Sequence, residues 1–187
     1  MNTGVKKQVN NASYKTTIDI GASRFKQVAW YFTNILFFKN SLNIISSLKV
    51  SLLKLFGAQL GTGVVIKPAV NIKYPWKLQV GDHTWIGEQV WIDNLSNVTI
   101  GKNVNLSQGS LLLTGSHDHT RTSFDFMSYP IVLEDGVWIG AKAVVFGGTI
   151  CRSHSILGMN SVAEKDLEAY TIYKGNPAIA VITRTIL

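Results

Sequence analysis

The sequence has almost no cysteine to form disulfides and no apolar run long enough to span a membrane. Its 187 residues include one cysteine, Cys151, and four prolines. A single cysteine excludes an internal disulfide. The most apolar stretch, residues 29–38, is interrupted by Thr33 and Asn34 and falls far short of the roughly 20 residues that cross a bilayer. Residues 1–20 are polar and show no secretory signal, which favours a cytoplasmic location.

Acidic residues are also scarce. Eleven Asp and Glu stand against eighteen Lys and Arg, giving a net charge of +7, and charged residues make up only 16% of the chain. The basic residues form no run and match no nucleic-acid-binding motif, so we expect no nucleic-acid partner. The excess of positive charge fits an anionic small ligand or an acidic membrane surface equally well. Because 46% of the residues are hydrophobic, we expect a partner subunit to cover part of the surface.

The main feature that is present is a repeat. From Leu60 onward, units of six residues each open with an apolar residue, and the units group in threes. The openers are Leu60, Ile66, Ile72, Val80, Ile86, Ile92, Ile100, Leu106, Leu112, Leu133, Ile139, Val145, Cys151, Leu157 and Ala163. A period of six fits neither a helix nor an ordinary strand. Three units make one triangular coil, so the pattern predicts an all-β solenoid.

The repeat also predicts where side chains point. The openers should fill a narrow core shared by stacked coils, and Cys151, as an opener, is unsuited to act as a nucleophile. Gly often follows the opener, as at Gly140, and we attribute this to a positive φ at the turn. Trp85, Trp91 and Trp138 are not openers and should face outward.

We expect four segments along the chain. They are a polar lead-in over 1–22, a helical cap or membrane-proximal segment over 23–58, a β-helix over 59–168 with a protruding loop at 118–132, and a C-terminal tail over 169–187. The second predicted helix carries one apolar face, made of Leu42, Ile45, Leu48, Leu52 and Leu55. This face either covers the first coil or lies on a membrane surface. Ser41 and Gly57 are the expected caps of that helix.

The long interruption of the repeat holds the candidate site, because a loop of this length between regular coils is usually functional. His117 stands at its root and should lie on the outer surface, where an imidazole can act as a general base. His119 follows closely, but no third ligand joins the two, so we expect no metal. Asp93 and Asn94 lie one coil earlier and are candidates for binding substrate hydroxyls.

Several segments are more specific than the hexad pattern. They are Lys67-Pro68, Asn71-Ile72-Lys73-Tyr74-Pro75-Trp76, Trp85-Ile86-Gly87, Trp91-Ile92-Asp93-Asn94, Thr114-Gly115-Ser116-His117-Asp118, Gly136-Val137-Trp138-Ile139-Gly140-Ala141 and Gly175-Asn176-Pro177-Ala178. With them, the chain from Trp30 to Ala178 resembles the hexapeptide-repeat acyltransferases, and more narrowly the colanic acid and other exopolysaccharide acetyltransferases. The resemblance implies a left-handed parallel β-helix of about five coils with an N-terminal helical segment. It also implies a homotrimer with active sites between subunits.

The resemblance assigns roles to residues. It implies that His117 is the general base and that acetyl-CoA, the donor, lies along Trp138, Gly140, Ala141, Gly158, Met159, Lys174, Asn176 and Pro177. Asp93, Asn94 and Asp118 would hold the acceptor. The expected reaction is acetyl transfer to a hydroxyl of a sugar or lipid-linked sugar in polysaccharide biosynthesis, with contact to the inner face of the membrane left open. The alternatives are N-acetylation of an amino sugar, a metal-binding β-helix, and a non-catalytic solenoid.

Overall fold

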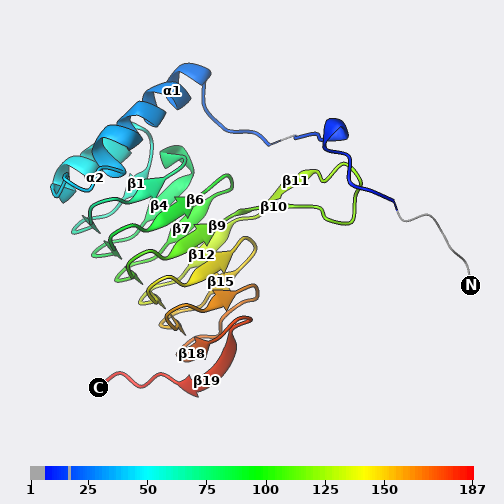
Figure 1. Cartoon of the computed structure of the whole chain (residues 1–187). Helices are drawn as coiled ribbons and strands as arrows, with labels where there is room; N and C mark the ends of the chain where they lie inside the picture. Colours follow the sequence, from blue (N-terminus) through cyan, green and yellow to red (C-terminus); the bar gives the residue numbers. More distant parts are fainter. Residues whose placement is uncertain (1–6, 17) are drawn as a thin grey trace, which may run out of the picture.

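Each predicted hexad forms one short strand followed by a turn. The computed structural model of the chain describes residues 7–16 and 18–187. The strands stack in parallel along one axis and make the three faces of a solenoid (Figure 1). The predicted parallel β-helix is therefore confirmed.

The three faces collect every third strand. The first face contains β1 (Gln59–Leu60), β4 (Leu78–Val80), β7 (Val98–Ile100), β12 (Ile131–Leu133) and β15 (Ile150–Cys151). The second contains β2 (Val65–Ile66), β5 (Trp85–Ile86), β8 (Asn105–Leu106), β13 (Trp138–Ile139), β16 (Ile156–Leu157), β18 (Thr171–Lys174) and β19 (Ile179–Thr183). The third contains β3 (Asn71–Ile72), β6 (Trp91–Asp93), β9 (Leu111–Leu113), β14 (Val144–Phe146) and β17 (Val162–Ala163).

The hexad openers form the core. Fourteen of the fifteen are at most 4% exposed, and Leu60, in the first coil, is half-buried. Strand register places equivalent openers above one another, as in the pairs Ile86 with Leu106 and Leu106 with Ile139. Each coil thus buries its interior against its neighbours. The core is one continuous column along the axis.

The solenoid has about six turns, one more than the sequence predicted. After the fifth coil, β18 pairs in parallel with β16, and Tyr173 takes the place of an opener beside Leu157. An aromatic residue in that position hides the repeat from a search for aliphatic openers. The last strand, β19, then turns back antiparallel to β18 and ends the stack.

The glycines that follow the openers do not have the positive φ that the sequence analysis predicted, so that prediction was wrong. Gly140 does not have a positive φ; a Cβ there would lie only 2.5 Å from the amide nitrogen of Met159 in the next coil. The glycine is needed because stacked backbones come too close for a side chain. Left-handed residues instead stand three positions after the openers, for example Ala69, Gln89 and Lys142.

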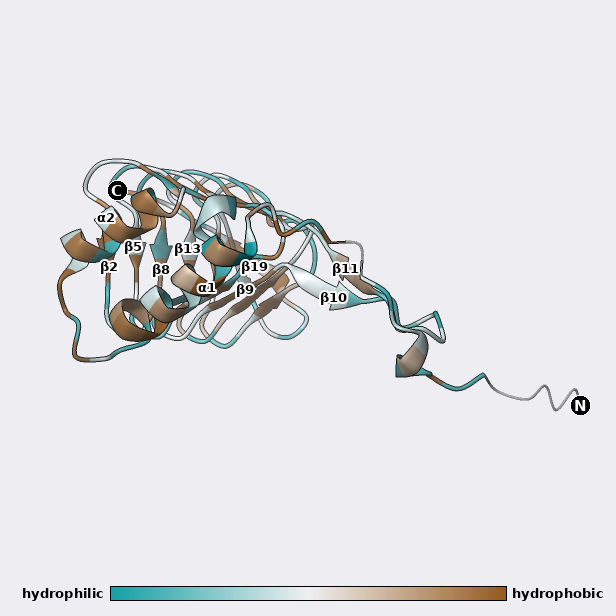
Figure 2. Ribbon diagram, turned by 90° about the horizontal axis from the view of Figure 1, so that it is seen from above, coloured by the Kyte–Doolittle hydropathy of each residue, from teal (hydrophilic) through white to brown (hydrophobic). Residues whose placement is uncertain are grey.

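All three interruptions of the repeat leave the solenoid at one corner, between the third face and the first. They follow β3, β6 and β9. The first contains a short 3-10 turn, η3 (Pro75–Lys77), and the third contains the hairpin of β10 (Gly115–His117) and β11 (Phe126–Ser128). Figure 2 shows this hairpin projecting far to one side of the solenoid.

Two helical segments cover the first coil. Helix α1 (Arg24–Thr33) continues into a π-helical turn, η2 (Asn34–Phe38), and buries Trp30, Asn34 and Phe38, which stand one turn apart. The indole nitrogen of Trp30 donates to the carbonyl of Ile72 at 3.0 Å. The amide of Asn34 donates to the Asn71 side chain at 2.8 Å. These contacts hold the helix on the open end of the stack.

Helix α2 (Ser46–Leu55) starts later than the apolar pattern predicts. Ser41 does not cap it. Ser41 and Leu42 lie in a turn, and in the irregular segment that follows the Asn43 side chain accepts from the Ile45 amide. Gly57 does follow its end, with φ +98°. Contrary to a simple cap, Lys49 and Leu53 are the buried side chains of α2, while Leu48 and Leu55 are exposed.

The described part of the predicted lead-in is attached to the rest of the fold. It contains a short 3-10 turn, η1 (Asn11–Ser13), and the Asn10 amide donates to the Thr122 carbonyl at 2.7 Å. The Trp76 indole donates to the carbonyl of Ile20. Residues 1–6 and Thr17 of this predicted segment lie outside the described residues. In residues 7–16 and 18–187, no helix combines the length and apolarity needed to cross a membrane.

Candidate active site

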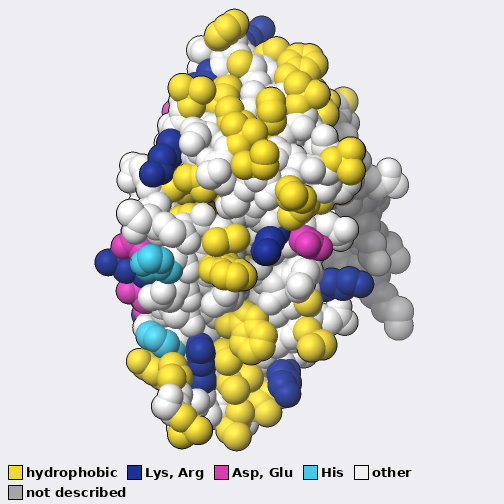
Figure 3. All heavy atoms as spheres, turned by 90° about the vertical axis from the view of Figure 1, so that its left-hand side faces the viewer, with side chains coloured by type: hydrophobic (Ala, Val, Ile, Leu, Met, Phe, Trp, Pro, Cys, Tyr) yellow, Lys and Arg dark blue, Asp and Glu magenta, His cyan; other side chains and the backbone are white. Residues whose placement is uncertain are grey.

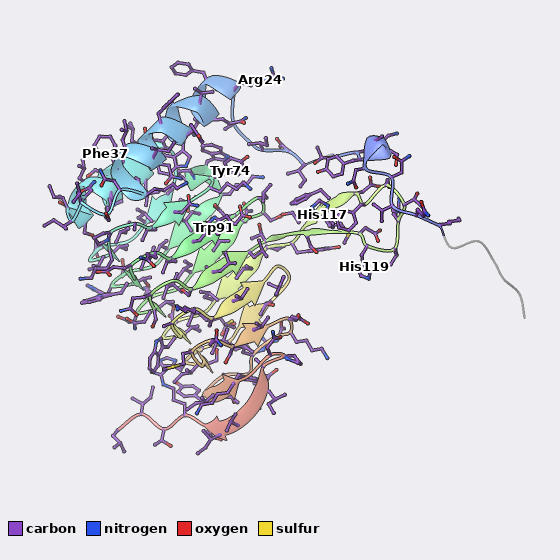
Figure 4. All side chains as sticks on the ribbon, in the orientation of Figure 1. Arg24, Phe37, Tyr74, Trp91, His117 and His119 are labelled. Atoms are coloured by element: carbon purple, nitrogen blue, oxygen red, sulfur yellow. The ribbon has the colours of Figure 1, made fainter. Side chains whose placement is uncertain are left out.

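The candidate histidine stands on the projecting hairpin. Strand β10 pairs antiparallel with β11, with His117 opposite Phe126. The hairpin covers residues 115–128, and the chain is back in the solenoid at Ile131, so the projection begins and ends earlier than the predicted loop at 118–132. Figure 4 shows His117 on this arm, away from the body of the solenoid where Trp91 lies.

Aromatic rings and one hydrogen bond fix the imidazole of His117. Its ring stacks on Phe124 at 4.5 Å with an interplanar angle of 5°, and Phe126 meets its edge at 5.1 Å. Its Nδ1 lies 2.9 Å from the carbonyl oxygen of Phe124. A carbonyl only accepts, so Nδ1 carries the proton and Nε2 keeps its lone pair. The half-buried ring is thus held in one orientation with Nε2 available to accept a proton.

Phe124, whose ring and carbonyl contact His117, has an unusual backbone conformation. Its φ is +48°, a region that bulky residues rarely adopt. The peptide after Phe124 is thereby turned so that its carbonyl meets His117. Backbone strain of this kind is held in place by surrounding structure and clusters at functional sites.

Asp118 supports the tip of the hairpin. Its carboxylate accepts from the Thr120 hydroxyl at 2.6 Å and amide at 3.0 Å, and it forms an ion pair with Arg121 at 3.1 Å. The hydrogen bonds from Thr120 lower the pKa of Asp118. Its carboxylate is therefore already engaged within the hairpin, whereas the neighbouring His119 is exposed.

Asp93 and Asn94 lie at the root of the same corner but have different surroundings. Asp93 forms an ion pair with Lys73 at 2.8 Å and lines a cavity of about 430 Å³ between α1 and the third face. Its backbone carbonyl accepts from the Thr114 amide and hydroxyl just before the hairpin. Asn94 is fully buried. Its side-chain oxygen accepts from the Tyr74 amide, and its side-chain nitrogen donates to the Tyr74 carbonyl. Asp93 therefore faces the cavity, while the amide of Asn94 is occupied by the fold.

The cavity beside Asp93 combines aromatic and polar groups. It is lined by Gln27, Val28, Trp30, Tyr31, Asn34, Ile35, Lys39, Asn71, Lys73, Tyr74, Trp91 and Asp93. Tyr74 comes from the corner after β3 and Trp91 from strand β6 of the third face, and both are labelled with His117 in Figure 4. Apolar rings with a few charged and amide groups are typical of a small-molecule site.

A second cavity runs along the second face near the C-terminal end. It encloses about 720 Å³ and is lined by Ser107, Gln108, Trp138, Gly140, Ala141, Ile156, Leu157, Gly158, Met159, Asn160, Ser161, Ile172, Lys174, Gly175 and Ile182. We call it the β13–β18 groove. Six of the eight residues predicted to bind the donor line it; Asn176 and Pro177 follow in the exposed turn after β18.

The walls of the β13–β18 groove are fixed by local packing. The Trp138 indole donates to the Ser107 hydroxyl at 2.9 Å, which orients a half-exposed ring along one side. At Gly140 the stacked coils meet closely, leaving backbone rather than a side chain in the wall. Lys174 brings a positive charge to the groove from β18.

Apart from Lys174, sequence reasoning missed the residues of the groove that β18 and β19 supply. Ile172 and Ile182 line it, but neither belongs to a recognisable hexad. The signal was the apolar run after Pro177, which was assigned only to a tail. Arg184 has a structural position, because its guanidinium donates to the carbonyls of Gly136 and His154.

Two other candidate chemistries find little support in the described part of the chain. Cys151 is buried in the core, and burial raises the pKa of its thiol, so it is not poised as a nucleophile. Within residues 7–16 and 18–187, no group of three or more His, Cys, Asp or Glu side chains is placed to hold a metal ion.

Solved structures share this fold. The hexapeptide-repeat acetyltransferase VCA0836 of Vibrio cholerae matches with a TM-score of 0.78 at 23% identity, over 89% of this chain and 96% of that one. Its complex with acetyl coenzyme A matches with a TM-score of 0.75 at 25% identity, over 89% and 92%. The fold and its stacked hexads thus define the class of hexapeptide-repeat transferases. No protein-family model matches the sequence.

Curated relatives narrow the class. The chain is 36% identical over 164 residues to the colanic acid biosynthesis acetyltransferase WcaF of Escherichia coli (strain K12), covering 88% of this chain and 90% of the relative. It is 28% identical over 130 residues to the galactoside O-acetyltransferase of the same organism, covering 68% and 64%. The chain belongs to the hexapeptide-repeat acetyltransferase family, in the group of the colanic acid biosynthesis acetyltransferases.

Proposed function

We propose that this protein transfers an acetyl group from acetyl-CoA to a hydroxyl of a sugar unit used in exopolysaccharide biosynthesis. The observation that carries the proposal is the tethered imidazole of His117, whose Nε2 is left free to accept a proton. The relationship to WcaF and to a galactoside O-acetyltransferase supports a saccharide hydroxyl as acceptor. A cytoplasmic location follows from the use of acetyl-CoA.

The β13–β18 groove is the proposed donor site. The solved structure of VCA0836 in complex with acetyl coenzyme A matches 89% of this chain. Trp138 and the apolar residues Ile172 and Ile182 offer a wall for the pantetheine arm. Lys174 would pair with a phosphate, and the backbone of Gly140 and Ala141 would lie beside the thioester.

The cavity beside Asp93 is the proposed acceptor site. The carboxylate of Asp93 can accept from sugar hydroxyls, and the faces of Tyr74 and Trp91 suit the apolar faces of a sugar ring. Asp93 sits directly before the corner from which the hairpin leaves, since its carbonyl holds Thr114. The acceptor would therefore lie at the root of the arm that carries His117.

The chemistry is a direct transfer without an acyl-enzyme. The Nε2 of His117 takes the proton of the acceptor hydroxyl as the oxygen attacks the thioester carbonyl carbon. A backbone N–H of the groove stabilises the oxyanion of the tetrahedral intermediate. The carbon–sulfur bond then breaks, the acetyl group stays on the acceptor, and the proton on His117 passes to the departing thiolate.

A homotrimer would complete the site. No residue that lines the β13–β18 groove comes from the hairpin, although residues 115–128 are all described. A neighbouring subunit would place its hairpin, with His117, over the groove. Beyond Trp91, which lines the proposed acceptor cavity, the outward side chains Leu111, Val144 and Val162 of the third face form an apolar ladder suited to such a contact.

The test joins donor binding to turnover. Calorimetric titration of the purified protein with acetyl-CoA should show saturable binding near one site per chain. His117→Ala should retain that binding but lower turnover on a sugar acceptor by at least about a hundredfold. Near-normal turnover of the variant would remove His117 as the base, and no binding at about millimolar acetyl-CoA would remove the donor assignment. Parallel assays with hydroxyl and amino sugars separate O- from N-acetylation.

A further inference from the structure

The packing of α2 is inverted for a helix that only caps the solenoid. It buries Lys49 and Leu53 and turns Leu48 and Leu55 outward. A helix whose outer face met only water would expose the lysine and bury the leucines. The buried Nζ of Lys49 is made tolerable by donating to the Lys67 carbonyl at 2.8 Å. Of the apolar face that the sequence predicted, Leu52 packs against the core, whereas Leu42, Ile45, Leu48 and Leu55 are exposed on the outside.

The same outer surface continues over the turn before α2 and along α1. It contains eight large apolar side chains that take no part in the proposed acceptor cavity and that range from 37% to 85% exposed. They are Phe25, Phe32, Leu36, Leu42, Ile44, Ile45, Leu48 and Leu55, and we call them the outer helical surface. Figure 3 shows hydrophobic side chains gathered at the end of the molecule that holds the helices. A contiguous patch of this kind marks an interaction site.

The segment that carries the outer helical surface has charges of one sign. From Ile20 to Gly81 the chain has eight Lys and Arg and no Asp or Glu. Arg24 and Lys54 are exposed at the two ends of this surface, and neither forms an ion pair within the described residues. Apolar side chains bordered by basic ones match the interface of an anionic bilayer, which attracts cations and accepts apolar groups between its headgroups.

We propose that the outer helical surface binds an anionic lipid bilayer. Phe25, Leu42 and Leu55 would enter the headgroup region, with Arg24 and Lys54 beside lipid phosphates. The surface lies at the end of the solenoid (Figure 1), whereas the proposed subunit contacts use its sides. In the proposed trimer, three parallel solenoids would present three such surfaces on one side, and binding would gain from multivalency. That last point rests on the proposed assembly; the lipid contact itself does not.

Vesicle flotation tests the proposal with the full chain. The protein should float with vesicles of phosphatidylglycerol and phosphatidylcholine at about 0.1 M salt, detach at about 1 M salt, and not float with phosphatidylcholine alone. Each basic residue near an anionic surface is worth about fivefold in affinity, so Arg24→Gln with Lys54→Gln should weaken binding about 25-fold. The matched control, Lys142→Gln with Lys165→Gln, removes two exposed charges elsewhere and should change binding less than about twofold.

Substitution of apolar residues separates lipid from a protein partner. Phe25→Ser with Leu42→Ser changes two side chains that are each 85% exposed, so the fold should be unaffected, and flotation should be lost. Absence of flotation by the unsubstituted protein, or equal loss in both charge pairs, would overturn the proposal. So would a serine variant that floats normally but sediments as a smaller assembly, because that assigns the surface to a second copy. Acetyl-CoA titration of each variant reports the proposed transferase function independently.

Discussion

His117 and Phe124 face each other across the hairpin, with their rings stacked at 4.5 Å and the Nδ1 of the first 2.9 Å from the carbonyl oxygen of the second. One residue thus supplies both the plane that orients the imidazole and the acceptor that selects its tautomer. No carboxylate forms this hydrogen bond. The orientation of the His117 imidazole therefore depends on the backbone of a single residue with φ +48°.

Phe124 should act as a positioning residue. Phe124→Gly keeps the left-handed backbone accessible but removes the stacking ring, and we expect turnover to fall about tenfold with acetyl-CoA affinity unchanged. Phe124→Tyr should restore turnover. The nitrogen chemical shifts of the His117 ring report its tautomer and should change only in the glycine variant. Unchanged shifts and turnover in Phe124→Gly would refute the role.

Lys174 should contribute to donor affinity through its charge. Lys174→Gln removes the cation of the β13–β18 groove, and we expect the dissociation constant for acetyl-CoA to rise about tenfold, because a charge-assisted contact with phosphate is lost. The difference should shrink as salt is added. Lys165→Gln, an exposed lysine outside the groove, is the control. Equal effects of the two changes would indicate only a general loss of charge.

Asp93 should affect the acceptor and leave the donor unchanged. In Asp93→Asn the backbone bonds to Thr114 are preserved, but the carboxylate is lost from the cavity. We expect the KM for the sugar acceptor to rise about tenfold at constant acetyl-CoA affinity. Lys73→Met breaks the same ion pair and leaves the carboxylate in place. If both variants lose the same amount, Asp93 acts through the ion pair rather than on the acceptor.

Lys49 should make stability depend on pH. Burial lowers the pKa of Lys49 below its ordinary value, so the folded state releases this proton at a lower pH than the unfolded chain. Between the two pKa values the unfolded state binds more protons, and the free energy of unfolding contributed by Lys49 rises with pH. Urea titrations from pH 7 to about pH 10 should therefore favour the unsubstituted protein increasingly over Lys49→Met. Lys54→Met, an exposed position on the same helix, should show no such trend.

The core could be predicted from the sequence because one constraint recurs at every hexad. Positions such as Ile86 and Ile139 each have an aliphatic residue above and below, so the same residue type returns with a fixed period. The sixth coil was not predicted, because Tyr173 places an aromatic ring where the other coils have an aliphatic opener. Periodicity identifies a face only when its members belong to one chemical class.

The helical cap shows a second limit. The apolar spacing from Leu42 to Leu55 predicted one apolar face. In the structure Leu52 packs against the core while the other four residues of that face are exposed, because spacing does not say what a side chain meets. Lys49 is buried because a carbonyl of the first coil receives its ammonium group, a contact between residues 18 positions apart. Long-range contacts of this kind have no local signal.

The sequence predicted the parts of the candidate site that are set by local motifs. It did not predict the parts that are set by contacts between stacked coils. His117 stood out as the residue at which the repeat breaks, and six donor-site candidates line one groove. The amide of Asn94, in contrast, is used by the backbone of Tyr74 in the coil before it. Two residues that are adjacent in sequence, Asp93 and Asn94, therefore face different environments.

The corner from which the three insertions leave has a consequence for how this protein can vary. Strands β9 and β12 on either side of the hairpin keep their pairing with the coils above and below, so the length of the arm between them is decoupled from the stack. Doubling the length of such a loop costs only about 0.6 kcal/mol in closure entropy. The arm is thus a replaceable module: its chemistry can be exchanged, by evolution or by grafting, while the second face that forms the groove stays the same.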